Sequence, residues 1–423
     1  MNNLFAKTLV LLLICLSCKS QEKKVKSVIV GCNKPVEIIY YGDSISKNAK
    51  QVIYGDAIGK NVKKIIDENT KETLKDSLIN SLSIGVYINN VSYNFHYGEL
   101  TKGKGDRATN ETIYEIASVT KTFTGTLAAK AVLEGKLNLE EDIRMYLPQT
   151  YPNLEYKGEP IKIKHLLTHT SGLPGDIIAL DTEINQNLNE IEFNKIVVAH
   201  ENKKTKAIFF ESLSDINLTA NPGTTFNYSN AGTNLMGYIL EKVYKESFQK
   251  LIINEVVAKA QMEDTYFNVP KNKEHRLANG YLLGKPMPET NLANTLWGAE
   301  GALKSTTSDM LKYISYHFKN DKIVKESHKK IFEIDTDYWI GYFWWSIENQ
   351  NYDLHYRHDG GISRAKNVLA IFPENKIGIS IFTNESAISV NQKLSDLTHT
   401  IYNELKKNRF SENKTVGNNV CIS

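Results

Sequence analysis

The sequence predicts an α+β fold, in which an antiparallel sheet built from both ends of the chain is flanked by helices and joined to an all-helical subdomain. Two apolar runs joined by Asn89-Asn90 predict a hairpin in the first part of the chain. Helical segments with loops occupy the middle, from Ile161 to about Met262. Further β-type runs fill the final portion, and 423 residues can bury the core that such a fold needs.

The segment 1–18 has the parts of a secretion signal, because Lys7 precedes an apolar stretch from Leu9 to Leu16. That stretch is shorter than the about 20 apolar residues that span a bilayer. We therefore expect an exported protein of the periplasm or cell envelope. Ser17 and Cys18, followed by a polar segment, resemble a bacterial lipoprotein signal, which implies a lipid anchor on Cys18. Simple secretion is the alternative.

Residues 19–69 are expected to be an N-terminal extension or linker, with one strand from Val36 to Tyr41. Apolar residues at helical spacing follow from Asn61; they are Val62, Ile65, Ile66, Leu74 and Leu78. The hairpin then comprises Ile84 to Ile88 and Val91 to Tyr97. In the oxidising compartment expected here, Cys32 and Cys421 either pair or remain free thiols on flexible tails.

Small residues predict a helix from Ala117 to Leu133 that is buried on most sides and closed by Gly135. Four strands are expected near the C-terminus: Trp339 to Ile347, Tyr352 to Arg357, Val368 to Phe372 and Ile377 to Thr383. A helix from Val390 to Leu405 and a polar tail over 408–423 complete the chain.

The charge balance excludes one class of partner. Lys plus Arg number 51 and Asp plus Glu 48, and no long basic run is interleaved with aromatic residues. This gives no electrostatic footprint for nucleic acid. The expected ligand is a small molecule or a peptide.

The first candidate for chemistry is Ser118-Val119-Thr120-Lys121, where a spacing of three puts Ser118 and Lys121 on one helix face. A serine hydroxyl needs a base to become a good nucleophile, and a lysine can be that base if burial or charge lowers its pKa from about 10.4. The helix N-terminus also offers the N–H of Ser118 to an oxyanion. Alone, this tetrapeptide is equally typical of a helix N-cap and a solvated lysine.

Two further segments carry suitable polar groups. A Pro-Gly turn precedes Tyr228 and Asn230; a tyrosine can shuttle protons, and an amide can bind a substrate carbonyl. His358 follows a predicted strand and supplies a proton donor or a cation, while Gly360 and Gly361 allow a substrate to approach the backbone closely. Each segment alone predicts only a turn or a tight strand connection.

In this order and at these separations, the three segments resemble the S-x-x-K, Y-x-N and K-T-G elements of serine β-lactamases, penicillin-binding proteins and their relatives, especially the class C β-lactamase and D,D-carboxypeptidase branch. Flanking stretches are similar too: Glu115 to Ala117, Glu134 to Leu139, His165 to Leu173, Gly301 to Ser305 and Phe382 to Asn384. The resemblance runs from about residue 70 to 405. It implies a β-lactamase/transpeptidase-like serine hydrolase domain over 70–407.

The resemblance also implies roles for individual residues. Ser118 would be the acylated nucleophile, Lys121 the base in acylation, and Tyr228 a proton relay that helps water attack the acyl-enzyme. Asn230 would bind the substrate amide. The N–H of Gly361 would be the second oxyanion donor.

The third element departs from the β-lactamases at His358, where they usually carry Lys. With an unperturbed pKa near 6.5, a histidine offers a weaker and pH-dependent attraction for a substrate carboxylate. We still expect the backbone of Gly360 and Gly361 to bind the substrate. Efficient β-lactam hydrolysis is therefore less expected, whereas the serine hydrolase chemistry is unaffected. The expected reaction is hydrolysis of an amide or ester bond of the β-lactam or D-amino-acid peptide type, and an esterase or a D-aminopeptidase is an alternative.

Three other interpretations remain open. A non-hydrolytic envelope protein could keep this pocket to bind peptidoglycan fragments or sense β-lactams. His165 and His169 have ligand-like spacing for zinc, but no Glu follows the first histidine and no third ligand is clear, so we expect no metal or cofactor. The aromatic cluster indicates either a buried strand or a sugar or peptide groove; it comprises Tyr338, Trp339, Tyr342, Phe343, Trp344 and Trp345.

Overall fold

The computed structural model describes residues 36–41, 57–178 and 188–416 of the chain. The expectations about Cys18, and about pairing of Cys32 with Cys421, lie outside these described residues. Within the described ranges, no helix combines the length and the apolar character needed to cross a bilayer.

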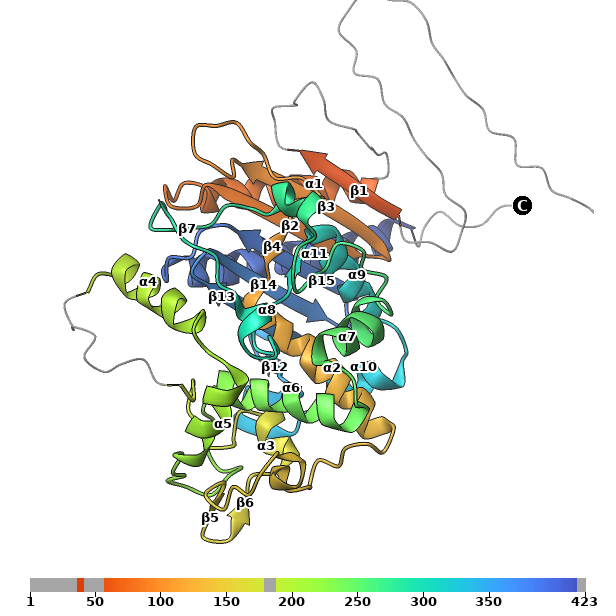
Figure 1. Ribbon diagram of the computed structural model, residues 1–423. Coiled ribbons are helices and arrows are strands. Elements are labelled where there is room, and N and C mark those ends of the chain that lie inside the picture. The colour runs from red at the N-terminus through yellow and green to blue at the C-terminus, as the bar shows by residue number, and fades with distance from the viewer. Residues whose placement is uncertain (1–35, 42–56, 179–187, 417–423) are drawn as a thin grey trace, which may run out of the picture.

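A nine-stranded sheet organises the fold, in the order β1-β3-β2-β15-β14-β13-β12-β11-β10. Its strands are β1 (Val36–Tyr41), β2 (Ser81–Ile88), β3 (Val91–Gly98), β10 (Phe332–Asp335), β11 (Tyr338–Gly341), β12 (Trp344–Asn349), β13 (Tyr352–Ile362), β14 (Ala365–Phe372) and β15 (Ile377–Thr383). Neighbours are antiparallel except β1 and β3, which are parallel. Because β2 pairs with β15, the sheet joins both ends of the chain, and the predicted fold class is confirmed (Figure 1).

The predicted hairpin is present, since Asn89 and Asn90 have φ of 53° and 63°, as a tight two-residue turn requires. The strand predicted over 339–347 is wrong, because the backbone reverses where Tyr342 and Phe343 have φ of 50° and 65°, and two strands result. The position predicted for the His358 segment is also wrong: it lies inside β13, not after a strand.

Helices cover both faces of the sheet. On one face, α1 (Ala57–Thr73) packs against α11 (Val390–Val416), and Ile66 and Ile401 are fully buried in the core between these helices and the sheet. Since Ile66 belongs to this core, the packed part of the chain begins before residue 70. On the other face, α9 (Thr307–His317) lies so close to β15 that a Cβ at Gly378 would be 2.2 Å from Ile314.

The remaining elements form the helical subdomain and its connections. The helices are α2 (Thr120–Leu133), α3 (Ile163–Leu167), α4 (Glu190–Glu201), α5 (Lys206–Ser214), α6 (Asn230–Tyr244), α7 (Phe248–Ile252), α8 (Leu292–Thr295) and α10 (Lys322–Ser327). Short turns are η1 (Ala117–Val119), η2 (Ile143–Tyr146), η3 (Ile253–Val257) and η4 (Lys271–Arg276). Small strand pairs are β4 (Tyr114–Glu115) with β9 (Lys304–Ser305), β5 (Glu155–Tyr156) with β6 (Glu159–Pro160), and β7 (Tyr281–Leu282) with β8 (Lys285–Pro286).

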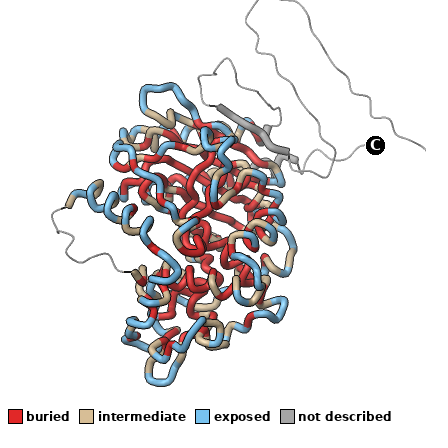
Figure 2. Tube along the Cα trace, in the orientation of Figure 1, coloured by how far each residue is buried: buried red, intermediate tan, exposed pale blue. Residues whose placement is uncertain are grey.

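Helix α2 lies in the interior of the molecule (Figure 1), and buried backbone runs through that interior from the sheet to the helical subdomain (Figure 2). As predicted, most of its residues are buried, and Gly135 follows it with φ of 68°. A Cβ at Gly125 would lie 1.8 Å from the carbonyl oxygen of Tyr342, so only glycine lets α2 approach the turn between β11 and β12 this closely.

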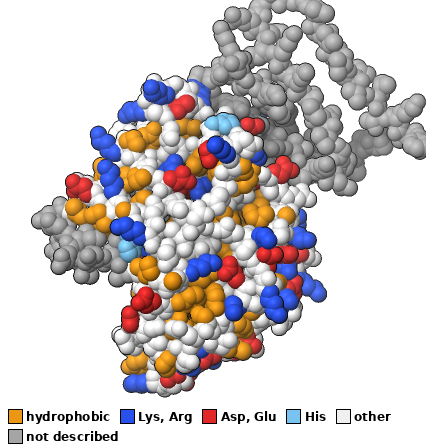
Figure 3. Space-filling model, viewed as in Figure 1, with side chains coloured by type: hydrophobic (Ala, Val, Ile, Leu, Met, Phe, Trp, Pro, Cys, Tyr) orange, Lys and Arg blue, Asp and Glu red, His pale blue; other side chains and the backbone are white. Residues whose placement is uncertain are grey.

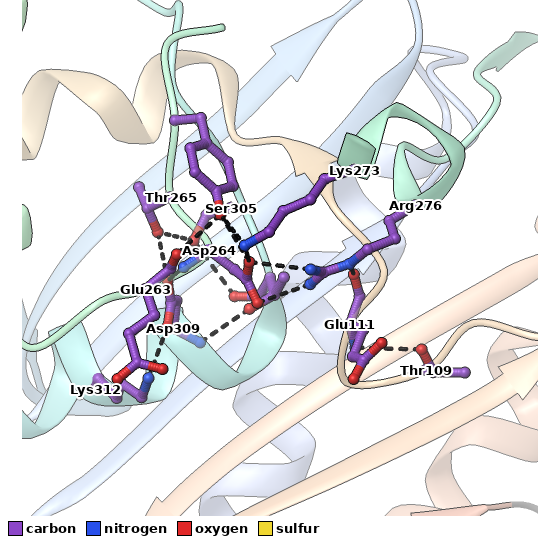
Figure 4. Close-up of polar contacts among 12 residues, drawn as sticks. Thr109, Glu111, Glu263, Asp264, Thr265, Lys273, Arg276, Ser305, Asp309 and Lys312 are labelled. Carbon is purple, nitrogen blue, oxygen red and sulfur yellow. Dashed lines mark hydrogen bonds and ion pairs between the residues drawn. The ribbon is translucent and has the colours of Figure 1, made fainter. Parts of the chain in front are cut away.

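An ionic cluster fixes the segment that precedes β9. The carboxylate of Asp264 accepts hydrogen bonds from Arg276 and Lys273, while Asp309 accepts from the side chain of Thr265 (Figure 4). This holds the segment around Thr265 against β9, where the hydroxyl of Thr265 lies 2.8 Å from that of Ser305. On the outer surface, charged side chains of both signs are interspersed on the face shown in Figure 3, as the near-balanced composition leads one to expect.

Candidate active site

Ser118 lies on a sharp turn between β4 and α2. The preceding residue, Ala117, has φ of 45°, a left-handed conformation that is uncommon for a residue with a Cβ. Pairing of β4 with β9 and a 3.0 Å hydrogen bond from the Ile116 N–H to the Leu303 carbonyl fix this turn. As a result, Ser118 is partly exposed in a cleft, while both of its neighbours are buried.

Lys121 lies one helical turn further on, as the spacing predicted, and its side chain is fully buried. Its Nζ is 3.3 Å from the Oγ of Ser118 and donates to the main-chain oxygen of Glu300 at 2.7 Å. Among the described residues, no carboxylate forms an ion pair with Lys121. The amine is therefore directed at Ser118 by a neutral carbonyl.

Tyr228 and Asn230 reach the same place from the N-terminal end of α6. The ring centroid of Tyr228 is 4.9 Å from the Nζ of Lys121. Between them in the chain, the Oγ of Ser229 caps α6 by accepting from the Gly232 N–H at 2.9 Å. The Oδ1 of Asn230 is buried without a hydrogen-bond partner among the described residues. Asn230 itself lines the cleft that contains Ser118.

His169 is a positioning residue to which sequence reasoning assigned only a turn. Its Nδ1 accepts the N–H of Ser229 at 3.2 Å, and its ring packs against Tyr228 with centroids 4.4 Å apart. Burial, followed by the nearby Lys121, holds the pKa of His169 well below its usual range, so the ring is neutral. The signal in the sequence is the His169-Thr-Ser-Gly turn itself.

The third element is supplied by β13, which runs beside η1. A Cβ at Gly360 would lie 2.3 Å from the carbonyl oxygen of Ile116, so glycine is required for this contact. From the next strand, the Asn367 side chain donates to the Glu115 carbonyl at 3.3 Å. Gly361 consequently lines the same cleft as Ser118.

His358 is only 2% exposed, and its Nδ1–H donates to the carbonyl of Asp359 at 2.8 Å. Its Nε2 is buried without a partner. Burial, with a smaller effect of Lys121, lowers the pKa of His358 to about 4. The ring is therefore neutral at pH 7, and the charge attraction considered from the sequence is not available at that pH.

The site residues line two hollows. A cleft of about 330 Å³ contains Ser118, Asn230 and Gly361 in its wall. Tyr228 and His358 line a second hollow of about 410 Å³. The aromatic cluster divides accordingly: Tyr338 and Trp345 line this second hollow, whereas Tyr342, Phe343 and Trp344 are fully buried.

His165 and His169, the two histidines with zinc-like spacing, have different structural roles. The Nδ1 of His165 accepts the Lys162 N–H at 3.1 Å and caps α3, while His169 holds Ser229. In the part of the chain that the structure describes, no group of three or more His, Cys, Asp or Glu side chains is arranged to hold a metal. Sequence reasoning also missed four charged residues that line the cleft, namely Glu190, Glu201, Glu300 and Lys366.

Comparisons with known proteins agree on one family. The Beta-lactamase family model matches residues 66–396. Protein flp of Staphylococcus aureus (strain N315) is 30% identical over 351 residues, which cover 80% of this chain. A Beta-lactamase of Providencia stuartii is 27% identical over 283 residues, or 65% of this chain and 65% of that protein. The chain spans 66% of the length of Protein flp.

The fold also has a counterpart among solved structures. Beta-lactamase/D-alanine carboxypeptidase from Yersinia pestis, complexed with citrate, superposes with a TM-score of 0.70 at 20% sequence identity. The superposition covers 82% of this chain and 99% of that one.

Proposed function

Because this chain belongs to the Beta-lactamase family, we propose that it is a serine hydrolase that cleaves an amide or ester bond through an acyl-Ser118 intermediate. The observation that carries the proposal is the 3.3 Å approach of the Lys121 Nζ to the Ser118 Oγ, in a cleft also lined by Asn230 and Gly361. A nucleophile and base within reach of each other are what acyl transfer through serine requires.

In acylation, Lys121 takes the proton of Ser118 as Oγ attacks the substrate carbonyl. The negative charge that develops on the carbonyl oxygen is stabilised by the N–H groups of Ser118 and Gly361, which act as an oxyanion hole. Tyr228, whose ring lies 4.9 Å from the Lys121 Nζ, passes a proton to the leaving nitrogen or oxygen, and the bond to that atom breaks.

In deacylation, a water molecule replaces the leaving group and attacks the acyl carbonyl. Tyr228, which gave up its proton in acylation, accepts the proton of the water, and Lys121 returns to the Oγ of Ser118 the proton that it took, as that Oγ leaves. Asn230 holds the substrate amide throughout. Each turnover thus adds one water across the bond and restores the enzyme.

The substrate we propose is a D-amino-acid peptide, an ester or a β-lactam. A β-lactam whose recognition depends on its carboxylate is the least favoured of these, because His358 is neutral at pH 7. We also propose that the chain is exported and that Cys18 carries a lipid; mass spectrometry of the mature N-terminus tests this.

A substrate panel tests the reaction class. Wild type and Ser118→Ala are compared on nitrocefin, a D-Ala-D-Ala peptide, a D-amino-acid amide and a short-chain ester. Each is also treated with a fluorescent penicillin and a fluorescent phosphonate. Turnover of at least one substrate and covalent labelling, both absent in Ser118→Ala, are expected. A label that persists for hours without turnover would instead indicate a sensor, and no label at all would overturn the proposal.

A further inference from the structure

Glu300 presents an unpaired carboxylate to the cleft that contains Ser118. Its main-chain oxygen accepts from Lys121 at 2.7 Å, so the residue adjoins the catalytic pair directly. Glu300 is 8% exposed and lines the cleft. Among the described residues, its carboxylate takes part in no hydrogen bond or ion pair, and a largely buried carboxylate without a partner is costly.

A second carboxylate, Glu201 at the end of α4, lines the same cleft. Its Oε1 accepts from Lys204 at 2.6 Å, but its Oε2 is buried without a partner. Burial and then the charge of Glu300, which lines the same cleft, raise the pKa of Glu201 to about 7. Glu300 and Glu201 therefore contribute two carboxylates to one cleft.

Among the described residues, no lysine or arginine forms an ion pair with the Glu300 carboxylate, although the charge of Glu300 is the largest of those that raise the pKa of Lys204 against the effect of burial. The side chain of Lys204 is 2% exposed, and its hydrogen bonds go to Asp176 and Glu201. Lys366 also lines the cleft, but its ammonium lies beside Gly361, 2.8 Å from where a Cβ would be, and the carboxylates that act on it are Glu190 and Asp359.

We infer that Glu300 and Glu201 form a subsite for a primary ammonium group of the substrate, beside the carbonyl that Ser118 attacks. The oxygens that lack partners call for N–H donors, which a primary ammonium supplies. A quaternary ammonium would instead favour aromatic faces, and no aromatic side chain is among the described residues that line this cleft.

The subsite deepens the proposed function and rests on it, because a substrate must reach Ser118 for the charge to matter. It favours a substrate with a free amino group, such as an aminoacyl or peptide compound with an unblocked terminus, over one whose recognition depends on a carboxylate.

A matched pair of phosphonate probes tests the subsite without knowledge of the natural substrate. One series carries a primary ammonium at the end of spacers of different length, and the other carries a hydroxyl at the same positions. The rate constant for covalent modification of Ser118 is measured by intact-protein mass spectrometry. Wild type should prefer the best ammonium probe over its hydroxyl partner by about tenfold or more, as hydrogen bonds to charged groups typically give.

Glu300→Gln should abolish most of that preference, because it removes the charge and retains the shape. Glu201→Gln is a second, independent test, and it should weaken the preference for the ammonium probe. The matched control is Glu211→Gln, the same charge change at an exposed position on α5, which should keep it.

The outcomes separate the two proposals. Equal modification rates for both probes in wild type, or a preference that survives Glu300→Gln and Glu201→Gln, would overturn the ammonium subsite and leave the serine hydrolase intact. Failure of every probe to modify Ser118 would overturn the proposed function and the subsite together.

Discussion

The Nζ of Lys121 lies 3.3 Å from the Oγ of Ser118 and only 2.7 Å from the main-chain oxygen of Glu300. The carbonyl fixes the amine from one side, and the serine lies on the other. Since Glu300 also lines the cleft that contains Ser118, the residue that orients the proposed base also faces the proposed substrate site. The base and the proposed ammonium subsite are thus parts of one arrangement.

Lys121→Ala is expected to lower kcat by a hundredfold to ten thousandfold, roughly, because that is the usual contribution of a positioned general base. Turnover of the best substrate in the panel measures the effect, and circular dichroism checks that the fold survives. Lys130→Ala, on the same helix but partly exposed, is the control. Retention of near-wild-type turnover by Lys121→Ala would refute the role of base.

Tyr228→Phe removes one hydroxyl and keeps the ring that packs against His169 at 4.4 Å. We expect kcat to fall by roughly a hundredfold or more, since a proton relay is lost, while KM and Tm change little. Steady-state kinetics and thermal unfolding measure these quantities. A rise in KM alone, with kcat unchanged, would assign Tyr228 to substrate binding only.

Sequence patterns were sufficient for the hairpin and for the relative position of Ser118 and Lys121 because both depend on local spacing. Asn89-Asn90 dictated the hairpin, and the three-residue separation of Ser118 from Lys121 placed them one helical turn apart. The reversal at Tyr342 was missed because aromatic residues seldom adopt positive φ, and only the close approach of α2 explains it. In the sequence, the aromatic run around Tyr342 is typical of one continuous strand.

The charged part of the cleft could not be predicted in the same way. Glu201 and Glu300 are 99 positions apart in the chain, and they share a cleft only because the fold brings the end of α4 to it. The low pKa of His358 likewise comes from burial by the fold, which a sequence does not express. Long-range packing and burial therefore account for what sequence reasoning left out.

Gly360→Ala tests whether stability and activity require close contact between β13 and the turn that carries Ser118. The new Cβ would be 2.3 Å from the Ile116 carbonyl and 2.5 Å from the Asn367 amide, so the strand or the turn must shift. A loss of about 1–3 kcal/mol in the free energy of unfolding is expected, together with most of the activity. Gly232→Ala is the control, because its Cβ would meet only ordinary contacts at 3.4 Å and beyond. Wild-type activity in Gly360→Ala would contradict this requirement.

The neutrality of His358 predicts a flat pH profile for substrate binding. Because burial lowers the pKa of His358 to about 4, its charge does not change between about pH 5.5 and 8.5. The KM of a carboxylate-bearing substrate should therefore vary no more in wild type than in His358→Gln over that range. A KM that worsens steeply above about pH 7 in wild type alone would show that the ring carries a proton when it binds.

Buried histidines that do not line the cleft predict a loss of stability in acid. Burial lowers the pKa of His355 to about 4 and that of His328 to about 3, against about 6.5 in an unfolded chain. Between about pH 6.5 and 4 the unfolded chain binds protons that the folded protein does not, so the free energy of unfolding falls as the pH falls. The slope is about 1.4 kcal/mol per pH unit for each such histidine.

His355→Phe isolates one of these contributions. The His355 ring already stacks on Phe372 with centroids 4.8 Å apart, so a phenyl ring should fit, although the hydrogen bond from its Nδ1–H to the Asp353 carbonyl is lost. Urea unfolding of wild type and variant at a series of pH values measures the slopes. We expect the variant to be less stable near pH 7.5 but to lose stability less steeply in acid, by about one histidine's contribution. Parallel profiles would mean that His355 is protonated equally in the folded and unfolded states.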